Sequence, residues 1–261
     1  MRNFRLIARL DVKMKTLIKG VQMEGWRKVG DPREFAARYA AEGADELMFT
    51  DVVASLYQRN SLHQIVRDVA SEVFVPMTIG GGVRSVGDAG ELLACGADKV
   101  ALNTGATQDP ALITEISQTF GAQACVVAIE TVRYEGEWMV MTDNGRNHTG
   151  RKALDWAREA TDRGAGEIIL TAIDKEGLGR GMDLDLVSRV CDSVRVPVVA
   201  AGGIGTKDHL GALLEKTPAS AVAVAQALHW NKLSLDDLRD TVSAHGHFVR
   251  PLGAVASSGG Q

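Results

Sequence analysis

The chain has 261 residues, of which 45% are hydrophobic and 24% are charged, and its formal net charge is −4. These proportions are ordinary for a globular protein with one large core, and the charge argues against nucleic acid as the main partner. No hydrophobic run approaches the length that spans a membrane. The three cysteines lack the spacing of a metal site, so we expect reduced thiols, no bound metal and a cytoplasmic protein.

An internal repeat dominates the sequence. Residues 75–84 read as a short apolar strand that runs into three glycines, and residues 196–205 are a near copy with a second glycine turn. Residues 43–50 are echoed in the same way by residues 164–171. Because repeats of this kind arise from a duplicated structural unit, we expect two similar halves.

In chain order, strands and helices alternate eight times. The expected strands cover residues 4–11, 46–53, the apolar run in 75–84, 99–102, 124–130, 167–172, the apolar run in 196–205, and 219–225. The expected helices cover residues 31–43, a stretch that ends near 73, 85–95, 109–120, 152–163, the stretches that follow 183 and 207, and 234–245. Two of these helices begin at a capping residue followed by proline, at Asp31-Pro32 and Asp109-Pro110.

Two connections depart from this regular alternation. The connection after the first strand runs as far as Gly30 and contains Lys19, and loops of this length are commonly functional. The connection after the fifth strand has Glu135-Gly136 between alternating residues, which indicates a small hairpin.

The even alternation and the halfway repeat favour a closed parallel barrel over an open doubly wound sheet. We therefore predict an α/β chain folded as one (β/α)8 TIM barrel with an internal half-barrel duplication, because about 250 residues is the usual size of that fold. The expected halves are about 1–122 and 123–250. Residues 251–261 are rich in Gly, Ser and Ala and are expected to form a disordered tail.

Ligands of such barrels bind at the C-terminal ends of the strands. The polar residues and glycines expected there are Asp11, Asp51, Gly82, Asn103, Thr104, Glu130, Thr171, Asp174, Gly203 and Gln226. Asp11 and Glu130 end the first and fifth strands on opposite sides of the mouth, which suits general acid–base catalysis if their environments separate their pKa values. The alternative is that each carboxyl group caps a loop.

The glycine turns indicate phosphate binding. Gly82 with Asn103 and Thr104 would hold one phosphate through backbone N–H and hydroxyl groups, and Gly203 with the end of the eighth strand would hold another. Two such sites across one mouth predict an elongated substrate with a phosphate at each end. Both turns could instead serve only to pack strands against helices.

Five stretches of the chain resemble the cyclase subunit of imidazole glycerol phosphate synthase, namely residues 9–13, 29–32, 80–84, 96–104 and 164–171. The resemblance runs nearly without gaps from about Arg5 to His245. That family is a (β/α)8 barrel. With ammonia from a glutaminase subunit, it converts a bis-phosphorylated ribulosyl formimino precursor of histidine into imidazole glycerol phosphate and an aminoimidazole carboxamide ribotide. The resemblance implies neither a metal nor an organic cofactor.

The resemblance also implies roles for single residues. Asp11 matches a catalytic aspartate and Lys19 a flexible-loop lysine, while the phosphate sites fall on Gly82, Asn103, Thr104 and Gly203. Four charged residues match an ammonia gate at the N-terminal end of the barrel: Arg5, Glu46, Lys99 and Glu167. A glutaminase would dock on that face to form a heterodimer. For these four residues the alternative is a structural salt-bridge cluster.

Three positions depart from the family pattern. Glu130 stands where the family has its second catalytic aspartate, Gln226 replaces a serine of the second phosphate site, and Asn144 replaces a serine of the loop after the fifth strand. The extra methylene of Glu130 moves its carboxyl group by more than about 1 Å, and a misplacement of about 1 Å can cost on the order of 10²-fold in rate.

Three functions therefore compete. The first is the cyclase reaction of histidine biosynthesis, which we expect because nearly all of the chain resembles that subunit. The second is an ammonia-channelling barrel that supplies a sugar-amidinating enzyme in surface-polysaccharide biosynthesis, a branch that residues 18–25 and 53–57 resemble. The third is a non-catalytic bisphosphate-binding activator of the glutaminase.

Overall fold

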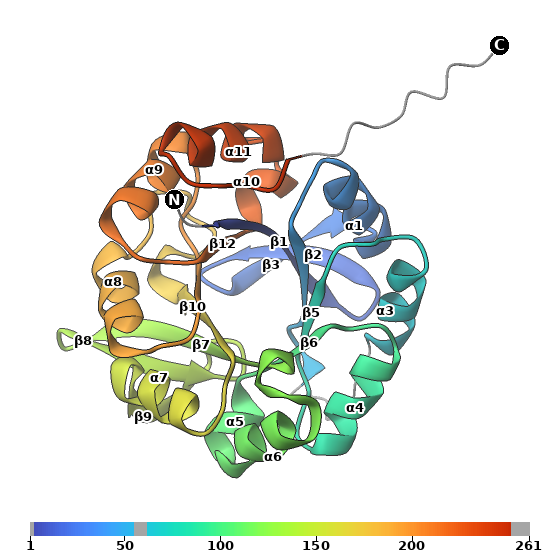
Figure 1. Cartoon of the computed structure of the whole chain (residues 1–261), viewed down its shortest axis with the longest axis vertical. Helices are drawn as coiled ribbons and strands as arrows, with labels where there is room; N and C mark the ends of the chain where they lie inside the picture. The colour runs from blue at the N-terminus through green and yellow to red at the C-terminus, as the bar shows by residue number, and fades with distance from the viewer. Residues whose placement is uncertain (1–2, 55–61, 252–261) are drawn as a thin grey trace.

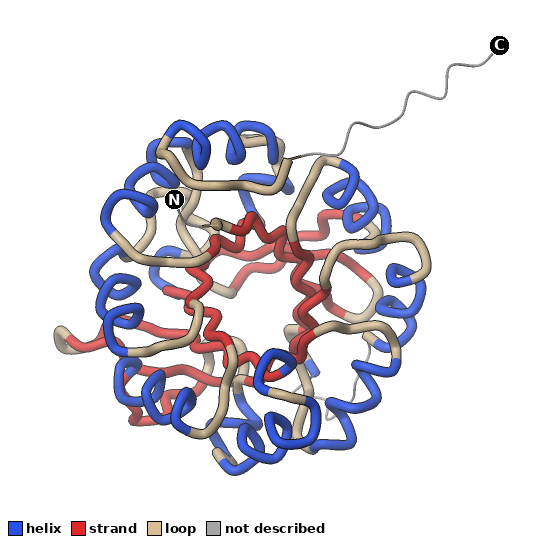
Figure 2. Tube along the Cα trace, viewed as in Figure 1, coloured by secondary structure: helices blue, strands red, loops and turns tan. Residues whose placement is uncertain are grey.

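The computed structural model describes residues 3–54 and 62–251. Eight parallel strands form a closed ring, and helices surround it on the outside (Figures 1 and 2). In barrel order the strands are β1 (Arg5–Lys13), β4 (Glu46–Asp51), β5 (Met77–Gly80), β6 (Lys99–Leu102), β7 (Cys125–Tyr134), β10 (Glu167–Ala172), β11 (Val198–Ala201) and β12 (Ala221–Val224). The ring closes because β12 pairs in parallel with β1. The predicted (β/α)8 barrel is confirmed.

The helices follow the strands as the alternation predicts. The larger ones are α1 (Pro32–Ala41), α3 (His63–Ala70), α4 (Val86–Ala94), α6 (Ala111–Phe120), α7 (Ala153–Asp162), α8 (Leu184–Ser193), α9 (Lys207–Lys216) and α11 (Leu235–Ala244). Two short helices, α5 (Thr104–Gln108) and α10 (Gln226–His229), start directly at the ends of β6 and β12. None of the helices in the described part of the chain is long and apolar enough to cross a membrane.

Side-chain caps fix several helix starts where the sequence predicts them. Asp31 accepts a hydrogen bond from the Arg33 N–H, and the Pro32 that follows opens α1. Ser234 and Asp237 form a reciprocal capping box at the start of α11. Such caps satisfy backbone N–H groups that have no partner inside the helix, so they set the boundary locally.

Two β-hairpins extend the barrel strands beyond the mouth. The connection after β1 is an antiparallel pair, β2 (Thr16–Val21) and β3 (Glu24–Gly30), where the sequence had suggested a plain loop. The expectation failed because the charges of this stretch obscured a short buried segment, Leu17 and Ile18, that pairs with β1. The hairpin predicted after β7 is present as β8 (Glu137–Thr142), and a third strand, β9 (Asn147–Lys152), follows it.

Two stretches discussed in the sequence analysis lie partly outside the described residues. Residues 53–57, which resemble the surface-polysaccharide branch, lie outside them from residue 55 on. The expected tail, 251–261, lies outside them from residue 252 on.

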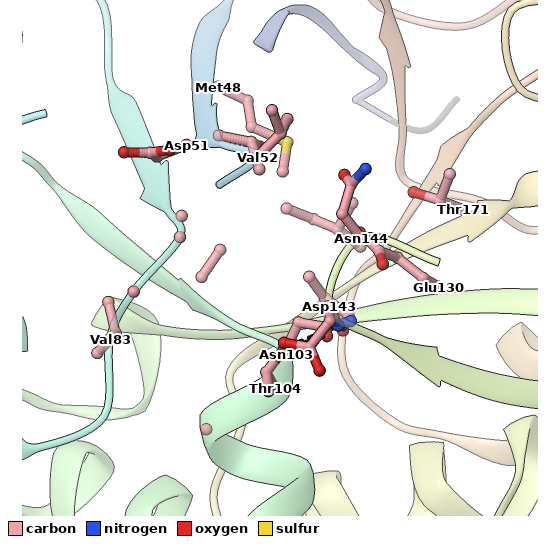
Figure 3. A pocket seen from close by; sticks show the side chains of 18 of the residues that line it. Met48, Asp51, Val52, Val83, Asn103, Thr104, Glu130, Asp143, Asn144 and Thr171 are labelled. Carbon is pink, nitrogen blue, oxygen red and sulfur yellow. Dashed lines mark hydrogen bonds between the residues drawn. The ribbon is translucent and has the colours of Figure 1, made fainter. Parts of the chain in front are cut away.

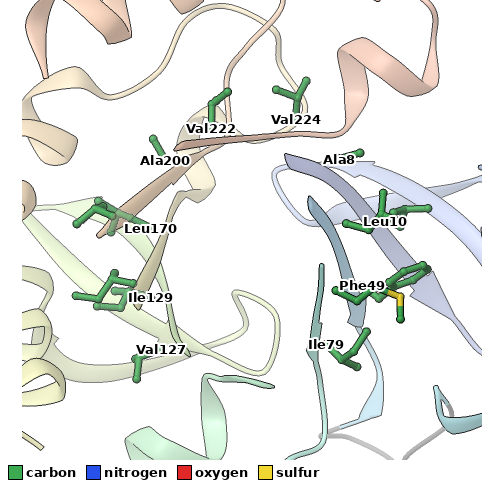
Figure 4. Packing of buried hydrophobic residues seen from close by; sticks show 14 of the residues in the cluster. Ala8, Leu10, Phe49, Ile79, Val127, Ile129, Leu170, Ala200, Val222 and Val224 are labelled. Carbon is green, nitrogen blue, oxygen red and sulfur yellow. The ribbon is translucent and has the colours of Figure 1, made fainter. Parts of the chain in front are cut away.

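The core has two layers, one on each face of the barrel wall. Outward-facing aliphatic side chains pack between the strands and the helices, and Figure 4 shows Leu10, Phe49, Leu170 and Val222 among them. A second cluster fills the interior of the barrel: Ile7, Met48, Ala101, Val126, Ile169, Val199, Ala201, Ala221 and Ala223. Because strand residues alternate between faces, the residues above and below this inner layer also point into the barrel.

Candidate active site

A cavity of about 210 Å³ opens at the C-terminal ends of the strands. Its walls come from the glycine turn after β5, the start of α5, the turn between β8 and β9, and the inner faces of β7 and β10. In Figure 3, Glu130, Thr171 and Asn144 lie on one side of this cavity, and Asn103 and Thr104 lie along its lower edge. Val83 marks the opposite wall.

The first predicted phosphate cradle is assembled in this cavity. Gly81 and Gly82 have φ values of 102° and 78°, in the left-handed region that favours glycine. A side chain at Gly81 would collide with the backbone of Asp51, so the turn passes close to the neighbouring strand. Asn103 and Thr104 line the same cavity at the start of α5. Backbone N–H groups at such turns suit an anion.

The second predicted cradle is much smaller. Gly203, with a φ of 108°, and Gln226 line a cavity of only about 10 Å³ on the other side of the mouth. Glu176 enters the same space. The Oε1 atom of Gln226 is buried and has no hydrogen-bond partner among the described residues. In this conformation the space holds about one water molecule rather than a phosphate group.

Asp11 is held as an anion. Its Oδ1 atom accepts a hydrogen bond from Arg9 Nε at 2.8 Å, and its Oδ2 atom accepts one from Lys19 Nζ at 2.9 Å. Lys19 is also paired with Glu176. Burial alone would raise the pKa of the Asp11 carboxyl, but Arg9 and Lys19 outweigh it and hold that pKa well below its usual range.

Glu130 has the opposite environment. Burial raises the pKa of its carboxyl to about 7, because the nearby positive charge of Arg9 only partly offsets the loss of water and Asp11 adds repulsion. Its Oε2 atom has no hydrogen-bond partner in the described part of the chain. The two carboxyl groups therefore sit at the ends of opposite strands with pKa values pushed in opposite directions, the pattern of an acid–base pair.

The other predicted mouth residues differ in their placement. Thr171 faces the large cavity, level with Glu130 on the neighbouring strand β10. Asp174 lies outside both cavities, and its carboxylate accepts a hydrogen bond from the Arg133 N–H at 2.7 Å. Asp11 does not line the large cavity either. The side chain of Arg9, which donates a hydrogen bond to Asp11, lines that cavity instead.

The four charged residues predicted at the opposite end of the barrel form a closed ring. Arg5 pairs with Glu46 at 2.9 Å and with Glu167, and Lys99 pairs with Glu46 at 2.9 Å and with Glu167 at 2.7 Å. Each cation thus contacts both carboxylates, and the glutamates occupy equivalent positions of the sequence repeat formed by residues 43–50 and 164–171. The ring lies below the inner apolar cluster, at the N-terminal ends of the strands.

Comparison with known proteins identifies the family. The family model described as "Histidine biosynthesis protein" matches residues 5–234. The chain belongs to this family. Three relatives carry the name "Imidazole glycerol phosphate synthase subunit HisF". The one from Legionella pneumophila is 57% identical over 78% of this chain and 97% of its own length.

The other two relatives cover almost the whole barrel. The HisF from Myxococcus xanthus (strain DK1622) is 45% identical over 95% of this chain and 98% of its own length. The HisF from Gluconacetobacter diazotrophicus is 42% identical over 96% of this chain and 97% of its own length. The resemblance inferred from the sequence motifs is thereby confirmed.

In this member of the histidine biosynthesis family, two mouth residues were missed from the sequence. Arg9 was detectable, because it lies two positions before Asp11 on β1 and strand residues two apart share a face. Glu176 left no comparable signal, since it comes from the connection after β10 and lies far in sequence from Lys19, with which it pairs beside the small cavity.

Proposed function

We propose that this chain is the cyclase subunit of an imidazole glycerol phosphate synthase. It takes ammonia from a glutaminase subunit and converts the bis-phosphorylated ribulosyl formimino precursor into imidazole glycerol phosphate and an aminoimidazole carboxamide ribotide. The observation that carries this proposal is the pair of buried carboxyl groups, Asp11 and Glu130, whose pKa values are pushed in opposite directions. Glu130 lines the cavity beside the glycine turn, and Asp11 binds the Arg9 guanidinium that lines the same cavity.

The two carboxyl groups take complementary parts in the reaction. Addition of ammonia to a carbonyl group needs a proton delivered to oxygen and another removed from nitrogen. Glu130 keeps its proton up to about pH 7 and lines the cavity, so it is the proton donor. Asp11 remains a carboxylate and stabilises positive charge that develops on the ammonia nitrogen. The proton lost from nitrogen passes to the Glu130 carboxylate that the first transfer leaves behind.

The substrate is placed by its phosphates. One phosphate lies against Gly82, Asn103 and Thr104, beside Glu130 in the large cavity. The other lies at Gly203 and Gln226, where space forms when Lys19 leaves Glu176 and the β2–β3 hairpin moves. Binding energy from these remote groups is what holds the reacting atoms in line.

Ammonia enters through the charged ring of Arg5, Glu46, Lys99 and Glu167 and passes the inner apolar cluster. Several members of that cluster are alanines, such as Ala101 and Ala223, which leave less side-chain volume in the barrel interior. The glutaminase docks on the same face as the ring, so a heterodimer releases ammonia directly at the entrance. Each charge of the ring is already paired with an opposite charge, so the ring offers no unpaired charge that would hold an ion there.

The experiment is ammonia-dependent turnover of the bisphosphate precursor by the wild-type chain and by a double variant, Glu130→Asp with Gln226→Ser. Turnover by the wild type at the rate of an ordinary HisF subunit, and glutamine-dependent turnover once a glutaminase is added, support the proposal. A wild type without turnover, together with a large gain in the double variant, contradicts it. That result would indicate a barrel whose site no longer performs the cyclase reaction.

A further inference from the structure

Arg9 occupies the centre of the barrel mouth. It is only 3% exposed, and it lines both the large cavity beside Glu130 and the small cavity beside Gln226. Among the described residues no other side chain lines both cavities. A molecule that reaches from one glycine cradle to the other has to pass the Arg9 guanidinium.

The guanidinium is held in place from two directions. Its Nε atom donates to Asp11 at 2.8 Å, and one terminal nitrogen donates to Thr171 Oγ1 at 3.2 Å. Asp11 comes from the same strand and Thr171 from β10, so the planar fork bridges the barrel. Lysine, with a single nitrogen on a flexible stem, cannot make this bridge.

The charges around Arg9 show why a cation is tolerated there. Its charge is attracted by three carboxyl groups, Asp11, Glu176 and Glu130. Lys19 neutralises part of this negative charge by pairing with Asp11 and Glu176, but it lines neither cavity. Arg9 and Arg84 are the cations that line the large cavity, and of these two only Arg9 also lines the small one.

We propose that Arg9 is a further substrate-binding residue of this synthase, which holds an oxygen atom of the sugar-derived link between the two phosphate groups. The inference rests on the proposed function, because it takes the bisphosphate as the ligand. Arginine carries only hydrogen-bond donors, so its partner on the substrate is an acceptor, a hydroxyl or carbonyl oxygen. This contact places the link beside Glu130 and above Asp11.

The test compares Arg9→Lys and Arg9→Gln with a control, Arg158→Lys. Arg158 is an exposed residue of α7, and its ion-pair partner Asp155 lies 3.6 Å away on the same helix. Arg158 lines neither cavity of the mouth. For each protein we would measure the affinity for the bisphosphate by calorimetry, the affinity for inorganic phosphate, the thermal midpoint, and kcat and KM with ammonium salt. Arg9→Lys decides the question if Arg9→Gln does not fold.

We expect Arg9→Lys to bind the bisphosphate at least about tenfold more weakly, while its affinity for inorganic phosphate and its thermal midpoint stay close to those of the control. A bisphosphate affinity within twofold of wild type overturns the proposal. A parallel loss of phosphate affinity and thermal midpoint also overturns it, because that result indicates general damage. If the wild type binds the bisphosphate but does not convert it, the proposed cyclase function fails, and the binding comparison still decides the role of Arg9.

Discussion

The protonation of Glu130 should be visible in the stability of the protein. Its pKa rises from 4.5 in the unfolded chain to about 7 in the fold, chiefly because the carboxyl group is buried. A raised pKa of a carboxyl group means that the fold favours the protonated form. Stability from this group is therefore fully present below pH 4.5 and is lost as the pH rises towards and through about 7.

The size of the effect follows from the two pKa values. Relative to a carboxyl group whose pKa stays at 4.5 on folding, Glu130 lowers the free energy of unfolding by about 1 kcal/mol at pH 5 and about 3 kcal/mol at pH 8. Glu130→Gln removes this cost at every pH. The amide of the variant keeps an acceptor for the Gly145 N–H that reaches the carboxyl group, and its NH₂ group takes the place of Oε2, which has no hydrogen-bond partner among the described residues.

The unpaired NH₂ group of Glu130→Gln carries a penalty of roughly 1–3 kcal/mol that does not depend on pH. The informative quantity is therefore how the difference in free energy of unfolding between the variant and the wild type changes with pH. We expect the variant to gain about 2 kcal/mol on the wild type between pH 5 and pH 8, which corresponds to roughly 4–8 °C in thermal midpoint for a chain of this size. Thermal unfolding followed by circular dichroism at the two pH values measures it.

The matched control is Glu115→Gln, at an exposed position of α6. Comparing each variant with the wild type at the same pH cancels the other titrating groups. The raised pKa of Glu130 would be refuted if the difference in thermal midpoint between Glu130→Gln and wild type stayed constant from pH 5 to pH 8. The same holds if that difference changed as little as the difference between the control and wild type.

Three further predictions concern turnover. At a fixed concentration of unprotonated ammonia, kcat/KM should fall as the pH rises through about 7, because Glu130 then loses the proton that it donates; a rate that rises through this range would make Glu130 a base. Asp11→Asn should lower the ammonium-driven rate by about 10²-fold or more in a steady-state assay, and a near-wild-type rate would remove Asp11 from the acid–base pair. Lys99→Glu should uncouple glutamine hydrolysis from product formation when a glutaminase is present, because it places three carboxylates in the charged ring. Equal coupling in variant and wild type would exclude a role of the ring as an ammonia gate.

The architecture could be predicted from the sequence because its signals are local. Each barrel strand is a short apolar run followed by a breaker, and helix starts such as Ser85 and Ser234 bear side chains that cap the helix themselves. The glycine turn after β5 was detectable for the same reason, since Gly81 needs a backbone conformation that other residues rarely adopt. The strand and glycine-turn signals of residues 43–50 and 75–84 recur in residues 164–171 and 196–205, which supports the assignment of both sets.

The arrangement of the mouth depends on contacts between distant parts of the chain, which no local pattern encodes. Lys19 meets Glu176 across 157 positions of sequence, and Arg9 meets Thr171 across 162. Burial of Glu130 beside an incomplete set of partners cannot be read from residue types, although it decides its pKa. The same limit explains Asp174, which stands at a strand end but turns outward to the backbone of Arg133.

The inward face of β1 contributes a residue to each level of the barrel interior, from the charged ring to the mouth. Its alternate residues place Arg5 in the charged ring, Ile7 in the apolar interior, Arg9 between the two cavities and Asp11 beside Lys19. The outward residues between them, Leu6, Ala8 and Leu10, pack under the helices. A shift of one residue in the pairing of β1 with β12 and β4 would exchange the two sets, putting four inward groups into the outer apolar layer and three aliphatic side chains into the barrel interior. The packing of the outer layer therefore fixes the register that aligns the charged ring, the apolar interior and the Asp11 carboxyl group along a single strand.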